Sequence, residues 1–170
     1  YTAIAAEGLV ELPNYEGMRE VDIPVENPGL VRWMLLLGQL GKPDTPEKEF
    51  LHEMYFYFFG QELLKANFIT PMRAHGEIPQ ADEKGVTKFK DGFKFDLAME
   101  KGTEKQQAMM FFTDWLRFRQ KFGEDWQGLI QQLDGNLSIH DVIINGTGKP
   151  EAGAYITESI FNKIKEAHKK

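Results

Sequence analysis

The chain has 170 residues, enough for one domain with a substantial core. Apolar residues make up 42% and charged residues 27%, which is typical of a folded globular protein rather than a disordered chain. Its 20 Lys and Arg residues against 26 Asp and Glu residues give a net charge of −6, which argues against broad binding of nucleic acid. The absence of cysteine excludes disulfides, thiolate nucleophiles and cysteine metal sites.

The first 25 residues carry glycine and proline at intervals and follow no hydrophobic period. We expect residues 1–25 to form an extended arm, in which residues 8–12 could add a short strand to a sheet. Residues 26–170 are expected to form the single domain. The most apolar run, residues 54–59, is far shorter than the roughly 20 residues of a membrane-spanning helix, so no membrane partner is predicted.

Two helices are predicted at the start of the domain. Asn27 followed by Pro28 is a helix-start pattern, because asparagine can cap free amides and proline suits the first helical position. Gly41 is expected to end this helix. Thr45, again followed by proline, predicts a second helix over residues 46–66. Apolar side chains recur through it at three- and four-residue spacing: Phe50, Leu51, Met54, Tyr55, Phe58, Phe59, Leu63 and Leu64.

Strand patterns follow the second helix. Residues 68–71 predict a short strand that ends at Pro71, and residues 72–85 predict a polar loop. The Asp-Gly pair at 91–92 predicts a hairpin turn, after which residues 93–99 alternate as one strand. The apolar face of that strand is expected to hold Phe93, Phe95, Leu97 and Met99.

The second half of the domain alternates strands and helices. Residues 107–112 are apolar on both faces, which indicates a central strand. Thr113 and Asp114 are expected to cap a helix, and residues 125–133 predict another helix before a buried strand at 142–144. The last elements are a strand at 155–156 and a helix capped by Thr157, with Ile160, Phe161 and Ile164 on its apolar face. The expected fold is a single α+β domain with a mixed or antiparallel sheet of four or five strands, an N-terminal helical hairpin and further packed helices.

A fragment of a phosphate-binding loop follows one predicted strand, in the Gly-Thr-Gly-Lys run at 146–149. The full pattern needs a glycine where Ile143 stands and a serine or threonine where Pro150 stands. We therefore interpret the run as a plain turn.

A fragment of an RNA-binding aromatic strand occurs at residues 92–95. Asp96 then stands where an apolar residue is needed, and Ala98 stands where an aromatic one is needed. We predict no nucleic-acid partner and interpret the rings as the buried face of a hairpin.

Catalytic and metal-binding patterns are incomplete. His52-Glu53 lacks the second histidine of a zinc-protease helix, and no serine lies in a Gly-x-Ser-x-Gly elbow. His140 and Asp141 are neighbours on a strand, so their side chains point to opposite faces. We predict no catalytic residue, no metal and no cofactor. The alternative is a small-metabolite hydrolase or transferase in which Asp114, Asp141 or His140 acts as acid or base.

Short motifs occur in a fixed order along the chain. They are the Asn-Pro helix start, Leu63-Leu64 before the strand at 68–71, Phe112-Thr113 after the hairpin, Trp115-Leu116 in the next helix, and Val142-Ile143-Ile144-Asn145 before the last strand and helix. In this order residues 26–168 resemble the SseB N-terminal domain family, named for an enhanced serine sensitivity phenotype. Met110 and Gly146 stand where the family usually has proline. The resemblance implies an α+β bacterial cytoplasmic domain without an established activity, cofactor or catalytic residue.

We expect a binding surface where two strands end. It would consist of Phe112, Thr113, Asp114, Asn145 and Gly146, because loops and helix amides form sites at such ends. The alternative reading of the same residues is helix capping by Thr113 or Asp114 and a glycine turn. The leading hypothesis is a non-enzymatic binding or interaction domain for a protein or small molecule, with a homodimer left open. A third hypothesis is an accessory subunit whose N-terminal arm docks on a partner.

Overall fold

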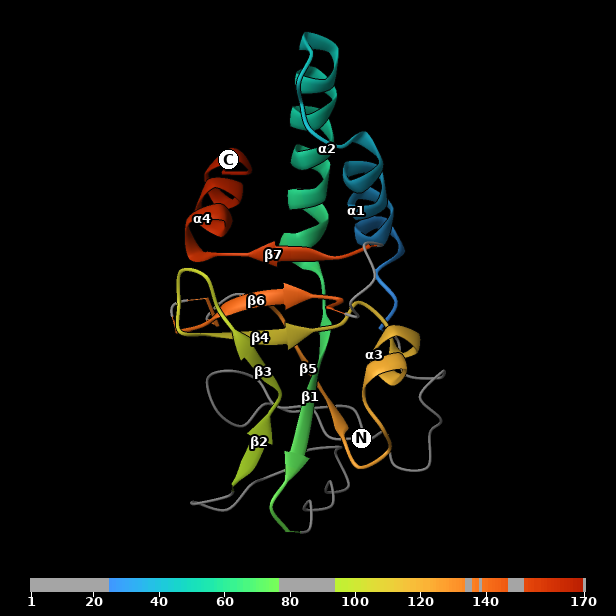
Figure 1. The fold of residues 1–170 in the computed structure, drawn as a ribbon, viewed down its shortest axis with the longest axis vertical. Coiled ribbons are helices and arrows are strands. Elements are labelled where there is room, and N and C mark those ends of the chain that lie inside the picture. The colour runs from blue at the N-terminus through green and yellow to red at the C-terminus, as the bar shows by residue number, and fades with distance from the viewer. Residues whose placement is uncertain (1–24, 77–93, 134–135, 138, 147–151, 170) are drawn as a thin grey trace.

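The computed structural model describes residues 25–76, 94–133, 136–137, 139–146 and 152–169. Within these ranges the chain forms four helices and seven strands (Figure 1). The helices are α1 (Pro28–Leu40), α2 (Pro46–Lys65), α3 (Trp115–Lys121) and α4 (Glu158–Ala167). The strands are β1 (Phe68–Ala74), β2 (Phe95–Leu97), β3 (Met99–Lys101), β4 (Gln107–Phe111), β5 (Gln127–Gln131), β6 (Asp141–Ile144) and β7 (Ala154–Ile156). The predicted α+β class is confirmed. Residues 1–24 of the predicted arm, residues 77–85 of the predicted polar loop, the turn at 91–92 and residues 147–149 of the predicted glycine turn lie outside the described residues.

The strands form two sheets. One is antiparallel with the order β2-β1-β5, and the other has the order β3-β4-β6-β7 and is mixed, because β4 and β6 run parallel. Ile69 and Phe112 join the two sheets by exchanging backbone hydrogen bonds of 2.9 and 2.8 Å. Parallel pairing of Phe111 with Ile144 brings the ends of β4 and β6 to one edge, so the residues after these strands meet there.

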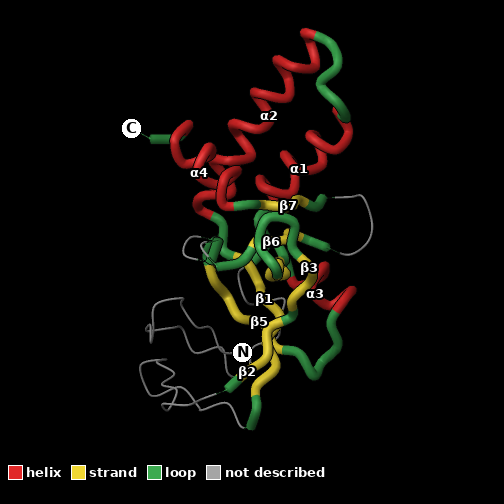
Figure 2. The backbone as a smooth tube through the Cα atoms, turned by 60° about the vertical axis from the view of Figure 1, so that its left-hand side comes forward, coloured by secondary structure: helices red, strands yellow, loops and turns green. Residues whose placement is uncertain are grey.

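Two apolar clusters pack on the four-stranded sheet, because successive side chains of a strand point to opposite faces. The larger cluster joins the sheet to α1, α2 and α4, which lie together at one end of the molecule (Figure 2). Its buried members include Leu30, Phe59, Phe111, Ile144 and Phe161. The smaller cluster lies under α3 and contains Val25, Ile69, Met110, Phe112, Trp115 and Phe118. The predicted central strand β4 therefore contributes side chains to both clusters, and the predicted buried strand β6 contributes Val142 and Ile144 to the larger one.

Three helices begin at the predicted caps. The hydrogen bonds run from Lys48 N to Thr45 Oγ1 (3.2 Å), from Arg117 N to Asp114 Oδ1 (2.9 Å) and from Ile160 N to Thr157 Oγ1 (3.3 Å). The prediction for Asn27 is wrong in its chemistry. Asn27 occupies the residue before α1, but its backbone is left-handed (φ 49°) and its side chain makes no capping bond to the helix.

The predicted helix at 125–133 is wrong, because this segment contains β5 instead. Gln127–Gln131 pairs along its whole length with β1, from Phe68 opposite Gln131 to Met72 opposite Gln127. Gly128 lies directly beneath the Trp115 ring and 2.9 Å, measured from an added Cβ, from Ile69 Cγ2. Tertiary pairing has overridden the helix-like spacing of the local sequence.

Two predicted strand boundaries are also wrong. β1 does not end at Pro71 but continues to Ala74, into the segment that was predicted to be a loop. The segment 93–99 is not one strand: β2 belongs to the three-stranded sheet and β3 to the four-stranded sheet, with Ala98 between them. The two mispredicted segments are in contact: Ala98, where the chain passes from one sheet to the other, donates its N–H to the Pro71 carbonyl (3.3 Å). The prediction of a buried aromatic face fails at Phe95, which is 37% exposed.

Candidate functional site

Thr113 and Asn145 form the centre of the predicted corner. Asn145 Oδ1 accepts from Thr113 N (3.0 Å), while Asn145 Nδ2 donates to Thr113 Oγ1 (2.9 Å) and to the Ala152 carbonyl (2.8 Å). The backbone of Asn145 is left-handed (φ 55°), a conformation that asparagine tolerates better than most residues. Thr113 and Asn145 are both buried, so these bonds are shielded from water.

The corner also receives the start of α1. Asn27 Nδ2 donates to the carbonyl of Thr113 (2.9 Å) and to the carbonyl of Asn67 (2.6 Å). Thr113 Oγ1 donates in turn to Asp114 Oδ2 (2.7 Å). One short polar network therefore connects the ends of β4 and β6 with α1, α2 and α3.

The five predicted site residues are brought to one edge of the sheet, but most of them are structural there. Phe112 is completely buried in the cluster under α3. Thr113 and Asn145 bond to each other, and the carbonyl of Gly146 accepts from Lys121 Nζ (2.6 Å). Of the five, Asp114 lines an open surface groove.

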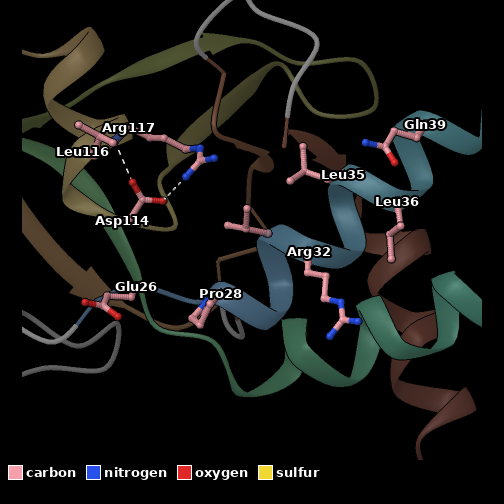
Figure 3. Close-up of a pocket in the computed structure, with 10 residues that line it drawn as sticks. Glu26, Pro28, Arg32, Leu35, Leu36, Gln39, Asp114, Leu116 and Arg117 are labelled. Carbon is pink, nitrogen blue, oxygen red and sulfur yellow. Dashed lines mark hydrogen bonds and ion pairs between the residues drawn. The ribbon is translucent and has the colours of Figure 1, made fainter.

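That surface is a groove of about 630 Å³ between α1 and the beginning of α3 (Figure 3). Its apolar lining consists of Pro28, Val31, Leu35, Leu36 and Leu116. Its polar lining consists of Glu26, Arg32, Gln39, Asp114 and Arg117. Leu35 is 37% exposed and Leu116 is 70% exposed, so two large apolar side chains meet water at the same groove.

The charges in the groove are largely compensated. Arg117 Nη1 lies 2.7 Å from Asp114 Oδ2, and both side chains are mostly buried (27% and 16% exposed). Figure 3 shows this pair at the α3 side of the groove. The Arg32 guanidinium lies over the Trp33 ring, 5.7 Å from its centroid. The groove is therefore better suited to an apolar group than to a small anion.

The position of Leu116 follows from its neighbours in α3. Trp115 and Phe118 point into the core, where their rings meet edge-to-face at 5.6 Å. Leu116, one position after Trp115, is rotated away from that core. Sequence reasoning counted Leu116 among the apolar residues of its helix and missed the groove. Leu35 was missed for the same reason, because only the packing of α1 beside α3 brings the two leucines together.

The acid–base residues of the alternative enzyme hypothesis do not come together. Asp114 follows the end of β4, whereas Asp141 begins β6 and pairs with Ala108 at the other end of β4. Ala108 and Asp114 are six residues apart along an extended stretch, which at about 3.3 Å per residue is a separation of up to roughly 20 Å. Asp114 and Asp141 are therefore far outside hydrogen-bond reach of each other. His140 comes just before β6 and is not part of the strand, and the hydrogen bonds to Asp141 Oδ2 come from other groups.

Asp141 holds a turn. Its Oδ2 accepts from the backbone N–H groups of Thr103 (3.2 Å), Glu104 (3.0 Å) and Lys105 (3.1 Å) and from the Tyr155 hydroxyl (2.7 Å). Burial by itself would raise the pKa of Asp141, but these four hydrogen bonds outweigh it and hold the pKa below its ordinary value of 3.8. Asp141 is thus an ionised structural group that fixes the connection between β3 and β4.

One His–Asp pair was missed by sequence reasoning. His75 Nε2 lies 2.8 Å from Asp96 Oδ1, and Arg73 Nη2 lies 3.3 Å from Asp96 Oδ2. The hydrogen bond from His75 is the main cause that lowers the pKa of Asp96. Only the pairing of β1 with β2 brings these residues together, and all three side chains are about half exposed. The arrangement is an ion-pair cluster on the outer surface of the sheet.

Metal-binding groups do not cluster within the described ranges, where no three His, Asp or Glu side chains are placed to hold an ion. Nor is any helix in that part of the chain both long and apolar enough to cross a membrane. Comparisons of the chain with protein-family models, with characterised proteins and with solved structures found no match. The groove between α1 and α3 is thus the strongest candidate site.

Proposed function

We propose that the protein is a non-enzymatic binding domain that holds an apolar segment of a partner protein in the groove between α1 and α3. The observation that carries this proposal is the exposure of Leu35 and Leu116 at one concave surface. Exposed apolar side chains that gather in a groove are typical of interaction sites, whereas singly scattered ones are not.

The chemistry of the groove favours a protein segment over a polar metabolite. Two helices form its walls, as in the grooves that bind amphipathic helices through apolar anchors. The Asp114–Arg117 pair is already satisfied within the chain, so a charged ligand would have to break it. An apolar side chain between Leu35 and Leu116 displaces water without that cost.

The expected affinity is modest. Burying a leucine side chain fully is worth about 1.5–3 kcal/mol, and part of the gain is offset by the freedom that the two partners lose on association. Leu35 and Leu116, which are 37% and 70% exposed, together with Val31 and Leu36 therefore support weak binding, with dissociation constants of about 100 μM to 1 mM. A partner in this range binds reversibly.

The cellular setting forms part of the same proposal. The order of short motifs that resembles the SseB N-terminal domain family supports a bacterial cytoplasmic protein without catalytic activity. In support of a binding role, the corner that this resemblance includes positions Asp114 and the start of α3 at the groove.

Selection of peptides from a random library on the immobilised protein tests the proposal. We expect the selected peptides to share apolar anchors, to raise the melting temperature and to lose binding when Leu116→Asp is introduced. Phe50→Asp on α2 is the matched control, because Phe50 is equally apolar and 66% exposed but lies outside the groove. Thermal shifts with amino acids, nucleotides and divalent ions, together with no peptide that maps to the groove, would instead indicate a small-molecule site.

A further inference from the structure

A second apolar surface lies on α2, away from the groove. Its members are Phe50 (66% exposed), Met54 (36%), Tyr57 (45%) and Phe58 (36%). The spacings of four, three and one residues place them along one side of the helix. We define these four residues as the α2 stripe.

Among the described elements, α1 and α4 make the main contacts with α2, and the α2 stripe stays at least 36% exposed at every member. The first half of α2 projects beyond the sheets in both Figure 1 and Figure 2. Trp33 of α1 stacks on Phe58 at 5.1 Å and supports the stripe from behind. At the other end the His168 ring lies 4.3 Å from the Tyr57 ring, and its Nε2 lies 2.9 Å from the Tyr57 carbonyl. Contacts with α1 and with the end of α4 therefore hold Phe58 and Tyr57 of the stripe in place.

We propose that the α2 stripe is a homodimer interface in which α2 of a second copy packs antiparallel against it. The stripe has the spacing of 3 and 4 residues from Phe50 to Met54, Tyr57 and Gln61, which is the pattern of a helix–helix seam. In a two-fold pair centred between Met54 and Tyr57, each Met54 meets the Tyr57 of the other copy. Phe50 then covers the apolar stem of Gln61 of the other copy.

The charges along α2 fit this antiparallel arrangement. Its first turn carries Glu47 and Glu49, and its last turn carries Lys65. The same two-fold axis places Glu47 beside Lys65 of the other copy, at both ends of the seam. Lys65 is 66% exposed and pairs with the less exposed Glu62 (3.2 Å) on its own helix, so its ammonium group lies at the surface and can reach across. A parallel pair would instead place the glutamates of the two copies together, which is unfavourable.

The size of the stripe sets the strength of the dimer. Aromatic side chains contribute about 150–250 Å² each, so the exposed fractions above leave about 400 Å² of stripe per copy. This is roughly half of the 800 Å² per partner that a standard stable interface buries. The dimer is therefore of the small, transient class and forms with rising protein concentration.

Sedimentation of the purified full chain between about 5 and 500 μM tests the inference in the concentration range of such weak dimers. We expect the mean mass to rise from monomer toward dimer, and Phe50→Asp to abolish the rise. Leu116→Asp is the matched control and leaves the rise unchanged, since it changes only the groove of the proposed function. A wild-type chain that stays monomeric over this range overturns the inference but leaves the proposed function of the groove unaffected. The inference is also overturned if Leu116→Asp abolishes the rise in mass and Phe50→Asp does not.

The charges on α2 allow a test that distinguishes the antiparallel dimer from nonspecific hydrophobic association. Glu47→Lys alone and Lys65→Glu alone should each weaken the dimer several-fold, and the double variant Glu47→Lys with Lys65→Glu should recover most of the wild-type affinity. If the double variant is as weak as the single ones, the antiparallel arrangement is wrong.

Disulfide cross-linking can report the register of the two helices. The chain has no cysteine, so only the introduced cysteines can react. A mixture of Met54→Cys and Tyr57→Cys chains should form the mixed disulfide under mild oxidation faster than a mixture of Met54→Cys with Gln120→Cys. Gln120 lies on the exposed side of α3 and serves as the control position. Equal rates in the two mixtures contradict the proposed interface.

Discussion

Thr113 and Asn145, which are 32 residues apart in the chain, bind each other through two buried hydrogen bonds of 3.0 and 2.9 Å. They lie where the parallel strands β4 and β6 end at the same edge of the sheet. Asn27 adds a third segment by donating to the Thr113 carbonyl. The corner predicted as a binding surface is thus mainly a structural hydrogen-bond network that connects distant segments. It positions α1 and α3 on the two sides of the groove.

Substitution of Asn145 tests this role of the corner. Asn145→Ala removes three hydrogen bonds and places alanine, which tolerates positive φ less well than asparagine, at φ 55°. We expect a loss of about 2–4 kcal/mol in the free energy of unfolding, because buried polar groups are left without partners. Asn145→Gly should cost about 1 kcal/mol less than Asn145→Ala, since glycine adopts positive φ freely. Urea unfolding measures both changes. Equal stability of Asn145→Ala and the wild type would show that the hydrogen bonds of the corner do not stabilise the fold.

Asp141 makes the fold sensitive to acid. Its pKa is lowered in the folded state, so its stabilising contribution is present above the unfolded pKa of about 4 and is lost as the pH falls through the lower folded value. Tyr155→Phe removes one of the four hydrogen bonds to Oδ2 and should raise the folded pKa. We expect the acid-unfolding midpoint of Tyr155→Phe, followed by circular dichroism, to move to higher pH.

Asp96 is the control for that acid-unfolding experiment. Its pKa is also lowered, first by the hydrogen bond from His75, but its side chain is 43% exposed. Water screens such a surface ion pair, so its contribution to stability is small. Asp96→Asn should leave the acid-unfolding midpoint nearly unchanged, and a shift as large as that of Tyr155→Phe would contradict our assignment of the acid sensitivity to Asp141.

Gly128 allows β5 to pass beneath Trp115. A Cβ at this position would run into the Trp115 ring and come within 2.9 Å of Ile69 Cγ2. We expect Gly128→Ala to lower the free energy of unfolding by about 1–3 kcal/mol through overpacking. Gly38→Ala is the matched control, because an added Cβ there meets nothing within 4 Å and alanine favours the helix. A neutral Gly128→Ala would mean that Trp115 shifts, which a change in its fluorescence would reveal.

The local chemistry of the sequence predicted much of this fold. The starts of α2, α3 and α4 follow from Thr45, Asp114 and Thr157, because a cap acts within three residues of the chain. The apolar runs of β4 and β6 indicated buried strands, since a strand that is buried on both faces has consecutive apolar residues instead of alternating ones. These features need no knowledge of distant contacts.

The failures all depend on distant contacts. Gln127–Gln131 is a strand because β1 pairs with it, although the spacing of its apolar residues predicted a helix. Asn27 turned its side chain toward Asn67 and Thr113 instead of its own helix. The site shows the same limit: the predicted corner residues do meet, but the groove depends on Leu35 and Leu116, which are separated by most of the domain and meet only after folding.

The measurement that tests the central claim most directly is the affinity of a selected apolar peptide for the groove variants, followed by fluorescence anisotropy. We predict that Leu116→Asp and Leu35→Asp each weaken binding at least tenfold, a loss of about 1.4 kcal/mol or more. Leu116 is 70% exposed, so the unfolding free energy of Leu116→Asp should stay within about 0.5 kcal/mol of the wild type, whereas Leu35→Asp should cost more stability while the chain stays folded. Phe50→Asp should bind the peptide with unchanged affinity. Wild-type affinity in both leucine variants would show that the groove between α1 and α3 is not the binding site.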